Sequence, residues 1–135
     1  MEAQRIFVYG TLRQGQHANS LMGSDPLAVG VIRSDSHTLV EVAGGSFPGI
    51  IQTEGVESPD IVGEVYEVSD PDTLHRLDMY EGYPTLYSKQ DVEVTLSDGD
   101  KVTCTTYIYN STFRGYEDSV IPEGDWVEYI NEEAA

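Results

Sequence analysis

Basic residues are scarce in this sequence. Seven lysines and arginines stand against 24 aspartates and glutamates among 135 residues, which gives a formal net charge of -17. Nucleic acids and anionic membrane surfaces are bound through cationic patches, so we expect this chain to bind neither. The acidic residues show no regular, phosphate-like spacing, and the favoured interpretation is therefore a solvated surface. The alternative is a non-catalytic acidic interaction module, such as a mimic of a nucleic acid.

Cysteine and long apolar runs are lacking as well. The single Cys104 cannot form an internal disulfide, and its place in an alternating segment predicts a small core residue. The alternative, a catalytic Cys-His pair, lacks a positioning motif. No apolar run approaches the roughly 20 residues of a membrane-spanning helix, and the N-terminus does not read as a secretory signal. We expect one domain over residues 1–135, cytoplasmic, and either a monomer or a weak homodimer.

Metal-binding and nucleotide-binding patterns are missing too. The three histidines, His17, His37 and His75, are far apart and show no ligand spacing. No serine lies in a nucleophile-elbow sequence, and no phosphate-binding loop is present. We therefore expect a protein without a metal site or a cofactor.

Short strands separated by turn residues dominate the chain. Apolar or alternating runs predict strands at residues 6–9, 27–32, 38–42, 47–52 and 61–68, followed by a hairpin of residues 91–96 and 102–109. Residues 17–21 add a candidate short helix. Several short strands with one or two short helices indicate an α+β fold, built round a small mixed or antiparallel β-barrel.

A longer helix is expected after residue 70. Asp70 is a suitable N-cap, Pro71 suits the first helical position, and Leu74 and Leu77 repeat on one face. Gly82 is the expected stop.

The segment Tyr9-Gly10-Thr11-Leu12 ends the first strand. Gly10 tolerates backbone angles that other residues avoid, so the strand can stop there. The amides of Thr11, Leu12 and Arg13 then lose their strand partners, and amides that converge can bind an anion or an oxyanion. A plain structural turn is the alternative.

Glu81 lies in the last turn of the expected helix, where a negative charge opposes the helix dipole. Three tyrosines flank it: Tyr80, Tyr83 and Tyr87. An aromatic and partly dry setting raises the pKa of a carboxyl group toward the range that suits proton transfer. The alternative is an exposed glutamate at a helix end.

Together these segments resemble the gamma-glutamylcyclotransferase-like family, in particular its gamma-glutamylamine cyclotransferase and avirulence-induced-protein branch. The first motif is Phe7-Val8-Tyr9-Gly10-Thr11-Leu12-Arg13-Gln14-Gly15. The second comprises a strand with Gly63-Glu64-Val65-Tyr66, a short helix, and then Glu81, Pro84 and Tyr87. Phe47-Pro48-Gly49-Ile50 is similar to a middle strand of the family. Two motifs in the expected order and spacing identify a family more specifically than either motif alone.

The resemblance implies an enzyme that cyclises a gamma-glutamyl amine or amino acid to 5-oxoproline and releases the free amine, without a cofactor. It implies that Glu81 is the general acid/base. The expected substrate-binding residues are Tyr9, Gly10, Thr11, Leu12, Tyr83 and Tyr87. The stretch from Asn110 onward matches nothing in the family pattern, so the leaving amine stays open. The strong negative charge favours cationic amines such as polyamines or lysine derivatives.

Overall fold

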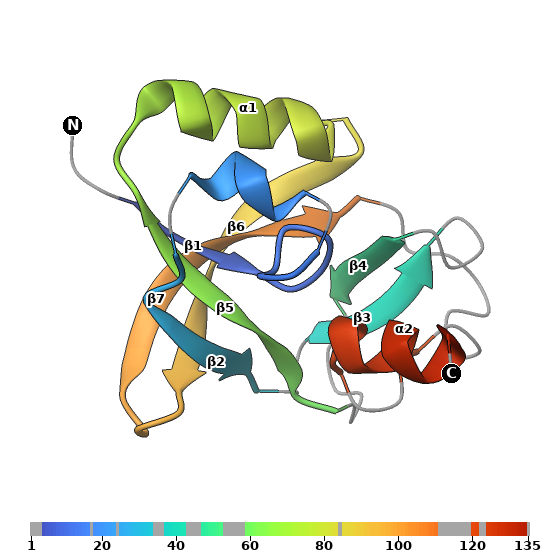
Figure 1. Cartoon of the computed structure of the whole chain (residues 1–135). Helices are drawn as coiled ribbons and strands as arrows, with labels where there is room; N and C mark the ends of the chain where they lie inside the picture. Colours follow the sequence, from blue (N-terminus) through green and yellow to red (C-terminus); the bar gives the residue numbers. More distant parts are fainter. Residues whose placement is uncertain are drawn as a thin grey trace.

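A computed structural model of the chain shows a closed β-barrel with a separate hairpin and helices packed around it (Figure 1). It describes residues 4–16, 18–23, 25–33, 37–42, 47–52, 59–83, 85–110, 120–121 and 124–134. The strands are β1 (Gln4–Val8), β2 (Ala28–Ile32), β3 (His37–Val42), β4 (Phe47–Gln52), β5 (Ile61–Val68), β6 (Tyr87–Leu96) and β7 (Lys101–Tyr109). The helices are the 3-10 turn η1 (Asn19–Met22), α1 (Pro71–Glu81) and α2 (Trp126–Ala134).

The barrel has the strand order β1-β5-β2-β6-β7 and closes between β7 and β1. The closing contact is parallel and pairs Ile6 with Thr105, whereas the other neighbours are antiparallel. The barrel is therefore mixed, which confirms the predicted α+β fold. The predicted hairpin is confirmed as β6 and β7, which pair from Tyr87↔Tyr109 to Thr95↔Lys101.

Strand β5 and the second half of β1 are buried on both faces. On β1, Phe7 belongs to one apolar cluster, while Ile6 and Val8 belong to another that includes Leu77 of α1 and Met22 of η1. Successive side chains of a strand point to opposite faces, so the two clusters lie on opposite sides of the barrel wall. Figure 1 shows α1 and η1 together over one side of the barrel. This explains why these two segments are nearly continuous apolar runs, whereas β6 alternates between buried and more exposed residues.

Cys104 belongs to the first of these clusters. Only 1% of the residue is exposed, and burial raises the pKa of its thiol to about 11. The predicted role as a small core residue is confirmed. A thiol with so high a pKa is a poor nucleophile near neutral pH.

Local sequence signals define both ends of α1. The Asp70 carboxylate accepts the Asp72 amide at 3.0 Å, and Pro71 is the first helical residue. At the other end Gly82 adopts φ 70°, the amide of Gly82 bonds to Met79 O, and the amide of Tyr83 bonds to Asp78 O. This pair of bonds is the Schellman arrangement, in which glycine ends a helix. The predicted helix is confirmed, and its last residue is Glu81.

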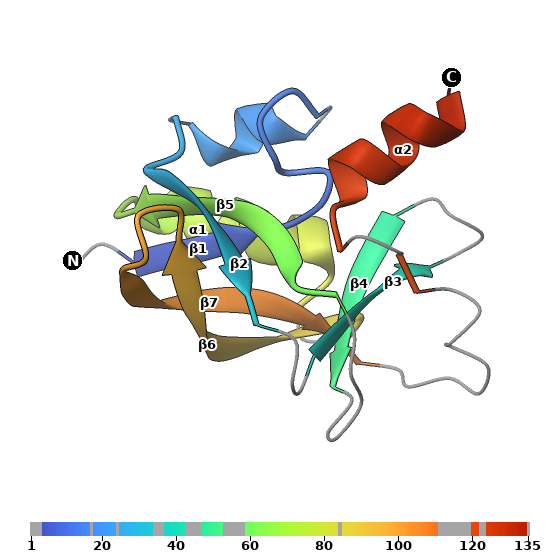
Figure 2. The ribbon, with the colours of Figure 1, turned by 90° about the horizontal axis from the view of Figure 1, so that it is seen from below.

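The β3-β4 hairpin lies beside the barrel, and α2 packs next to it (Figure 2). The helix α2 was not predicted. The sequence offers an N-cap for it, because Asp125 Oδ1 accepts the Glu128 amide at 3.2 Å. Residues 17–21 were expected to form a short helix; the structure has η1 slightly later, and His17 lies outside the described residues.

None of the helices in the described ranges combines the length and the apolar character needed to cross a bilayer.

Candidate active site

A cavity of about 290 Å³ opens between the end of β1, the end of α1, and strands β4, β6 and β7. It is lined by Phe7, Val8, Tyr9, Gly10, Thr11, Leu12, Pro48, Tyr80, Glu81, Leu86, Tyr87 and Tyr107. Ligand pockets generally span about 300 to 1,000 Å³, so this cavity suits a small ligand. The strand pairing and the end of α1 thus bring together segments that are distant in the sequence.

Six of the seven predicted site residues line this cavity. They are Tyr9, Gly10, Thr11, Leu12, Glu81 and Tyr87. The seventh, Tyr83, is not among the lining residues and is 41% exposed. The Lys89 ammonium lies 4.5 Å from the centre of its ring, a cation-π contact at the surface. Pro84, part of the second motif, lies outside the described residues.

The loop after β1 leaves two amides available. Arg13 N–H donates to Gly10 O at 3.0 Å, so the expectation that it would be free is wrong: the turn itself uses that amide. Within the described part of the chain, the amides of Thr11 and Leu12 make no hydrogen bond. These two N–H groups belong to residues that line the cavity, and they are candidates for binding an anion or an oxyanion.

Gly10 is required by close packing. A Cβ atom at this position would lie 2.5 Å from Pro48 Cγ, closer than real Cβ contacts. The absence of a side chain lets β4 approach the loop and form one wall of the cavity. Pro48 is thus a cavity residue, although no pattern near it in the sequence connects it with Gly10.

Glu81 is partly buried and has no hydrogen-bond partner among the described residues. Burial raises the pKa of its carboxyl group from 4.5 to about 7. The direction matches the expectation from its aromatic surroundings. A carboxyl group with a pKa near neutrality, facing a small cavity, can both accept and return a proton at physiological pH.

Three buried tyrosines surround Glu81 and donate their hydroxyl protons to other groups. Tyr9 donates to Tyr107 O at 2.7 Å, and Tyr87 donates to Pro48 O at 2.8 Å. Tyr107 donates to the Asp78 carboxylate at 2.7 Å. Burial raises the pKa of each of these phenols, so they stay protonated near neutral pH. Tyr107 was not predicted as a site residue, although the alternation of β7 placed it on a different face from Cys104.

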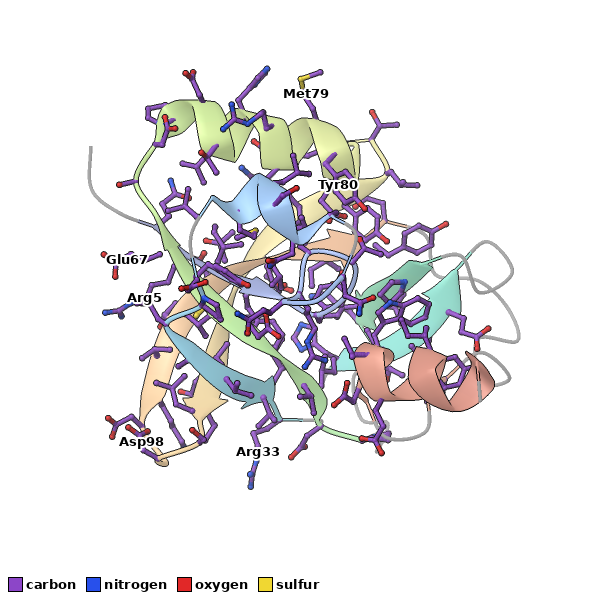
Figure 3. All side chains as sticks on the ribbon, viewed as in Figure 1. Arg5, Arg33, Glu67, Met79, Tyr80 and Asp98 are labelled. Atoms are coloured by element: carbon purple, nitrogen blue, oxygen red, sulfur yellow. The ribbon has the colours of Figure 1, made fainter. Side chains whose placement is uncertain are left out.

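Tyr80 connects the two halves of the cavity wall. Its hydroxyl lies 2.7 Å from Thr11 Oγ1, which joins the end of α1 to the loop after β1. In Figure 3 Tyr80 points toward this loop, whereas Met79 points away from the protein. Tyr80 is 42% exposed, so this bond lies at the solvent side of the cavity.

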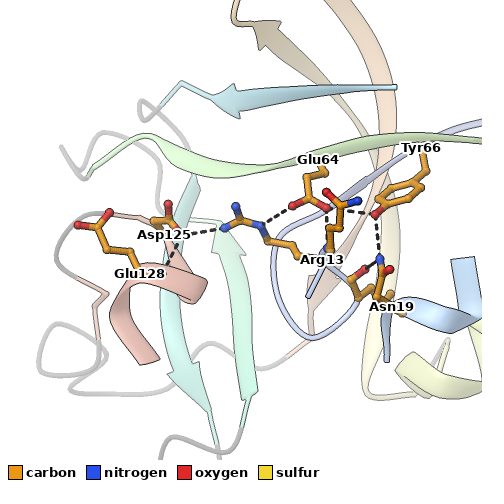
Figure 4. A network of polar contacts seen from close by, with 8 residues as sticks. Arg13, Asn19, Glu64, Tyr66, Asp125 and Glu128 are labelled. Atoms are coloured by element: carbon orange, nitrogen blue, oxygen red, sulfur yellow. Dashed lines mark hydrogen bonds and ion pairs between the residues drawn. The ribbon is translucent and has the colours of Figure 1, made fainter. Parts of the chain in front are cut away.

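Behind the loop lies a second polar network (Figure 4). Arg13 Nε lies 3.2 Å from Glu64, and Arg13 Nη1 lies 2.7 Å from Asp125. Glu64 also accepts the Gln14 amide at 2.8 Å and the Tyr66 hydroxyl at 3.1 Å. These bonds tie the loop after β1 to β5 and to the start of α2. The second predicted motif therefore provides strand β5, and through Glu64 it also supports the loop of the first motif.

The network continues through one further side chain. Asn19 Nδ2 donates to Leu12 O at 2.9 Å and to the Tyr66 hydroxyl at 2.8 Å. The Leu12 carbonyl is thereby held by a side chain that is not among the lining residues of the cavity. Among the residues that the structure describes, no group of three or more His, Cys, Asp or Glu side chains forms a metal site.

Comparisons with known proteins agree with this geometry. The family model described as "Gamma-glutamyl cyclotransferase, AIG2-like" matches residues 6–128. The chain is 31% identical over 114 residues to rat gamma-glutamylaminecyclotransferase, covering 76% of this chain and 75% of the relative. It is 33% identical over 111 residues to gamma-L-glutamyl-butirosin B gamma-glutamyl cyclotransferase of Niallia circulans, covering 78% of this chain and 66% of the relative.

A crystal structure of a mouse AIG2-like protein superposes with a TM-score of 0.75 at 28% identity, covering 91% of this chain and 88% of the other. The family model contains both motifs and continues to residue 128, so the expectation that the stretch from Asn110 onward matches nothing in the family is wrong. The chain therefore belongs to the gamma-glutamyl cyclotransferase, AIG2-like family and is an enzyme of the gamma-glutamylcyclotransferase type.

Proposed function

We propose that the protein converts a gamma-glutamyl amine to 5-oxoproline and the free amine, with Glu81 as the general acid/base. The observation that carries this proposal is the position of Glu81: a carboxyl group without a hydrogen bond among the described residues, with a pKa of about 7, facing the same cavity as the loop after β1. Cyclisation of such a substrate needs proton transfer, correct positioning and stabilisation of negative charge. It needs no external nucleophile.

The reaction moves two protons from the α-nitrogen of the substrate to the leaving nitrogen. The Glu81 carboxylate takes the first proton from the α-ammonium group, and the freed amine attacks the γ-carbonyl carbon. A C–N bond forms, the carbonyl oxygen becomes an oxyanion, and the ring nitrogen keeps two protons. Glu81 gives its proton to the leaving nitrogen, the oxyanion collapses, and the bond to that nitrogen breaks. The Glu81 carboxylate then takes the second proton from the ring nitrogen, which leaves the nitrogen of 5-oxoproline neutral, and passes it to the released amine, which departs as an ammonium ion. General acid-base catalysis of this kind contributes roughly a hundredfold to ten-thousandfold in rate.

The loop after β1 holds the glutamyl part of the substrate. The unpaired amides of Thr11 and Leu12 donate to the oxyanion or to the substrate α-carboxylate. The same cavity has aromatic walls, from Tyr9, Tyr87 and Tyr107, that exclude water and hold the chain bent. Holding reacting groups in a near-attack geometry contributes about 7 to 11 kcal/mol in favourable cases.

The leaving group is a neutral or cationic amine. Among the described residues that line the cavity there is no lysine or arginine, and the chain carries a net charge of -17. An anionic leaving group would find no cation among these lining residues, whereas a polyamine or a lysine-derived amine is attracted by the field of the protein. The names of the rat and mouse relatives, gamma-glutamylaminecyclotransferase, also point to amines.

The test is release of 5-oxoproline from a panel of gamma-glutamyl amines and gamma-glutamyl amino acids. We expect turnover by the wild type and at least a hundredfold loss in Glu81→Gln. Glu67→Gln is the matched control, because Glu67 is exposed on β5 outside the cavity and should keep wild-type turnover. Equal turnover by wild type and Glu81→Gln would exclude the assigned role. No turnover of any substrate would favour the non-catalytic acidic interaction module instead.

A further inference from the structure

The tyrosines around Glu81 have one property in common: none gives its hydroxyl proton to the glutamate. Each phenol carries a single proton, and each donates it elsewhere, to Tyr107 O, to Pro48 O and to Asp78. Glu81 would accept such a bond readily, because its carboxyl group has no partner within the described ranges. The acceptors that take these three protons therefore decide whether the Glu81 carboxyl group receives a hydrogen bond from a phenol.

Two of the three acceptors are backbone carbonyls and one is a side chain. Tyr9 and Tyr87 donate to carbonyls that belong to β7 and β4, so the fold itself fixes their direction. Tyr107 differs, because its acceptor is the Asp78 carboxylate at 2.7 Å. The direction of this one proton depends on a single side chain.

Asp78 lies three residues before Glu81 on α1 and does not line the cavity. Its side chain is 24% exposed, and the Lys89 ammonium lies 3.1 Å from its carboxylate on the solvent side. Tyr107 spans the distance between this carboxylate and the cavity that it lines. Asp78 can therefore influence Glu81 through Tyr107 without touching a bound substrate.

Resting on the proposed role of Glu81, we propose that Asp78 is a positioning residue: by accepting the Tyr107 hydroxyl proton, it keeps that proton off Glu81 and leaves the carboxylate without a hydrogen bond. A carboxylate that accepts a hydrogen bond is stabilised and becomes a weaker base. Loss of Asp78 frees the phenol to turn its proton toward the cavity. Tyr107 and Glu81 are close enough to interact, because the Glu81 charge contributes to the raised pKa of Tyr107, after burial and Asp78.

Apart from Tyr107, the groups that face Glu81 do not share this freedom. The titratable groups are Tyr9 at the end of β1, Tyr87 on β6, Tyr107 on β7, and Tyr80 and Asp78 on α1 itself. The nearest arginine of the loop, Arg13, is held by Glu64 and Asp125. Tyr80 is bonded to Thr11.

The experiment follows the Glu81 carboxyl carbon by NMR during a pH titration of the free protein. Four proteins are compared: the wild type, Asp78→Ala, Tyr107→Phe, and the double variant. In Asp78→Ala we expect the titration midpoint of Glu81 to fall by about one pH unit. Removal of the Asp78 charge by itself also lowers the Glu81 midpoint. The double variant has lost this charge but has no phenol proton at position 107, so it measures the effect of the charge alone.

The decisive comparison is between Asp78→Ala and the double variant. A lower midpoint in Asp78→Ala than in the double variant supports the proposal, and equal midpoints overturn it. Tyr107→Phe alone should leave the midpoint where it is in the wild type. A rise of about one unit in Tyr107→Phe would show that Tyr107 already donates to Glu81, which also overturns the proposal without any variant of Asp78.

The same set is then tested in 5-oxoproline release, where the acid limb of kcat/KM should move with the NMR midpoint. The NMR readout does not depend on turnover. If Glu81→Gln retains turnover, the proposed function fails, while the titration of Glu81 still decides what Asp78 does.

Discussion

Glu64 and Glu81 are the same side chain in two opposite settings. Glu64 is 6% exposed and accepts from Arg13, from the Gln14 amide and from the Tyr66 hydroxyl. Glu81 faces a cavity and accepts no hydrogen bond from the described residues, although three buried phenols lie around it. Whether a carboxyl group holds the fold together or remains available for chemistry is thus decided by the donors that reach it.

The two settings meet in one short loop. Arg13 and Gln14 are bound by Glu64, while Thr11 and Leu12, which directly precede them, line the cavity and have amides that bond to none of the described residues. The satisfied network therefore forms the rigid base on which the unsatisfied groups are presented. Functional groups are held in a productive geometry by partners that have no direct part in the reaction.

The largest effect on stability is expected from Glu64→Gln. The substitution removes the negative charge next to the buried Arg13 and turns an amide group toward donors that need an acceptor. Breaking a buried ion pair from one side costs about 3 to 5 kcal/mol. Urea unfolding measures this loss. Glu67→Gln on the same strand is the control and should change the free energy of unfolding by less than about 0.5 kcal/mol.

The second prediction concerns the pH dependence of turnover. Glu81 acts as a base only when it is ionised, and its pKa is about 7 rather than the ordinary 4.5. Activity is therefore present above pH 7 and falls about tenfold for each pH unit below it, reaching about a hundredth of the plateau at pH 5. The measurement is kcat/KM for 5-oxoproline release across this range. A profile that stays flat down to pH 5 would contradict the raised pKa.

Local signals made much of this arrangement predictable. Asp70, Pro71 and Gly82 define α1 through interactions within a few residues, so its ends and the position of Glu81 follow from the sequence. Gly10 was expected to end β1 through a backbone angle that other residues avoid, but it is not among the described glycines with a positive φ, and what requires glycine there is the contact with Pro48. Family resemblance placed Glu81 and the loop after β1 in one site, and the cavity contains both.

Contacts across the fold were not predictable in this way. Tyr83 is close to Glu81 in sequence, but the Schellman turn at Gly82 carries the chain outward and leaves Tyr83 at the surface. Tyr107 enters the cavity because β7 pairs with β6 and β1, which only the barrel establishes. Asp125 binds Arg13 over a separation of 112 residues, and no pattern near either residue points to the other.

The third prediction compares Glu81→Gln with the wild type in stability rather than in activity. Between pH 4.5 and 7 the folded wild type binds a proton that the unfolded chain releases, so its stability falls as the pH rises through this range and stays lower above it. The side-chain amide of the Glu81→Gln variant does not titrate, so it adds no such pH dependence to the free energy of unfolding. Glu81→Gln should gain about 1 to 2 kcal/mol relative to wild type at pH 8, less than the full shift gives because the cavity opens to solvent. Urea unfolding at pH 4, where the gain should vanish, is the internal control.

The smallest effect is expected at the bond between Thr11 and Tyr80, which closes the solvent side of the cavity at 2.7 Å. Tyr80 is 42% exposed, so water can replace a lost partner, and the bond should contribute about 0.5 to 1 kcal/mol. A double-mutant cycle of Thr11→Val and Tyr80→Phe isolates the coupling between the two hydroxyls. Tyr83→Phe is the matched control, because Tyr83 is 41% exposed and lies outside the cavity.

This weak bond completes the contrast between the two sides of the loop. The side that faces Glu64 is held by ion pairs, whereas on the side that faces Glu81 an exposed hydrogen bond between the hydroxyls of Thr11 and Tyr80 joins the loop to α1. Separation of the walls costs less on the second side, and we expect a substrate to enter there. A coupling above about 2 kcal/mol would mean that the cavity side is as firmly held as the Glu64 side, and the contrast between a rigid base and an accessible site would fail.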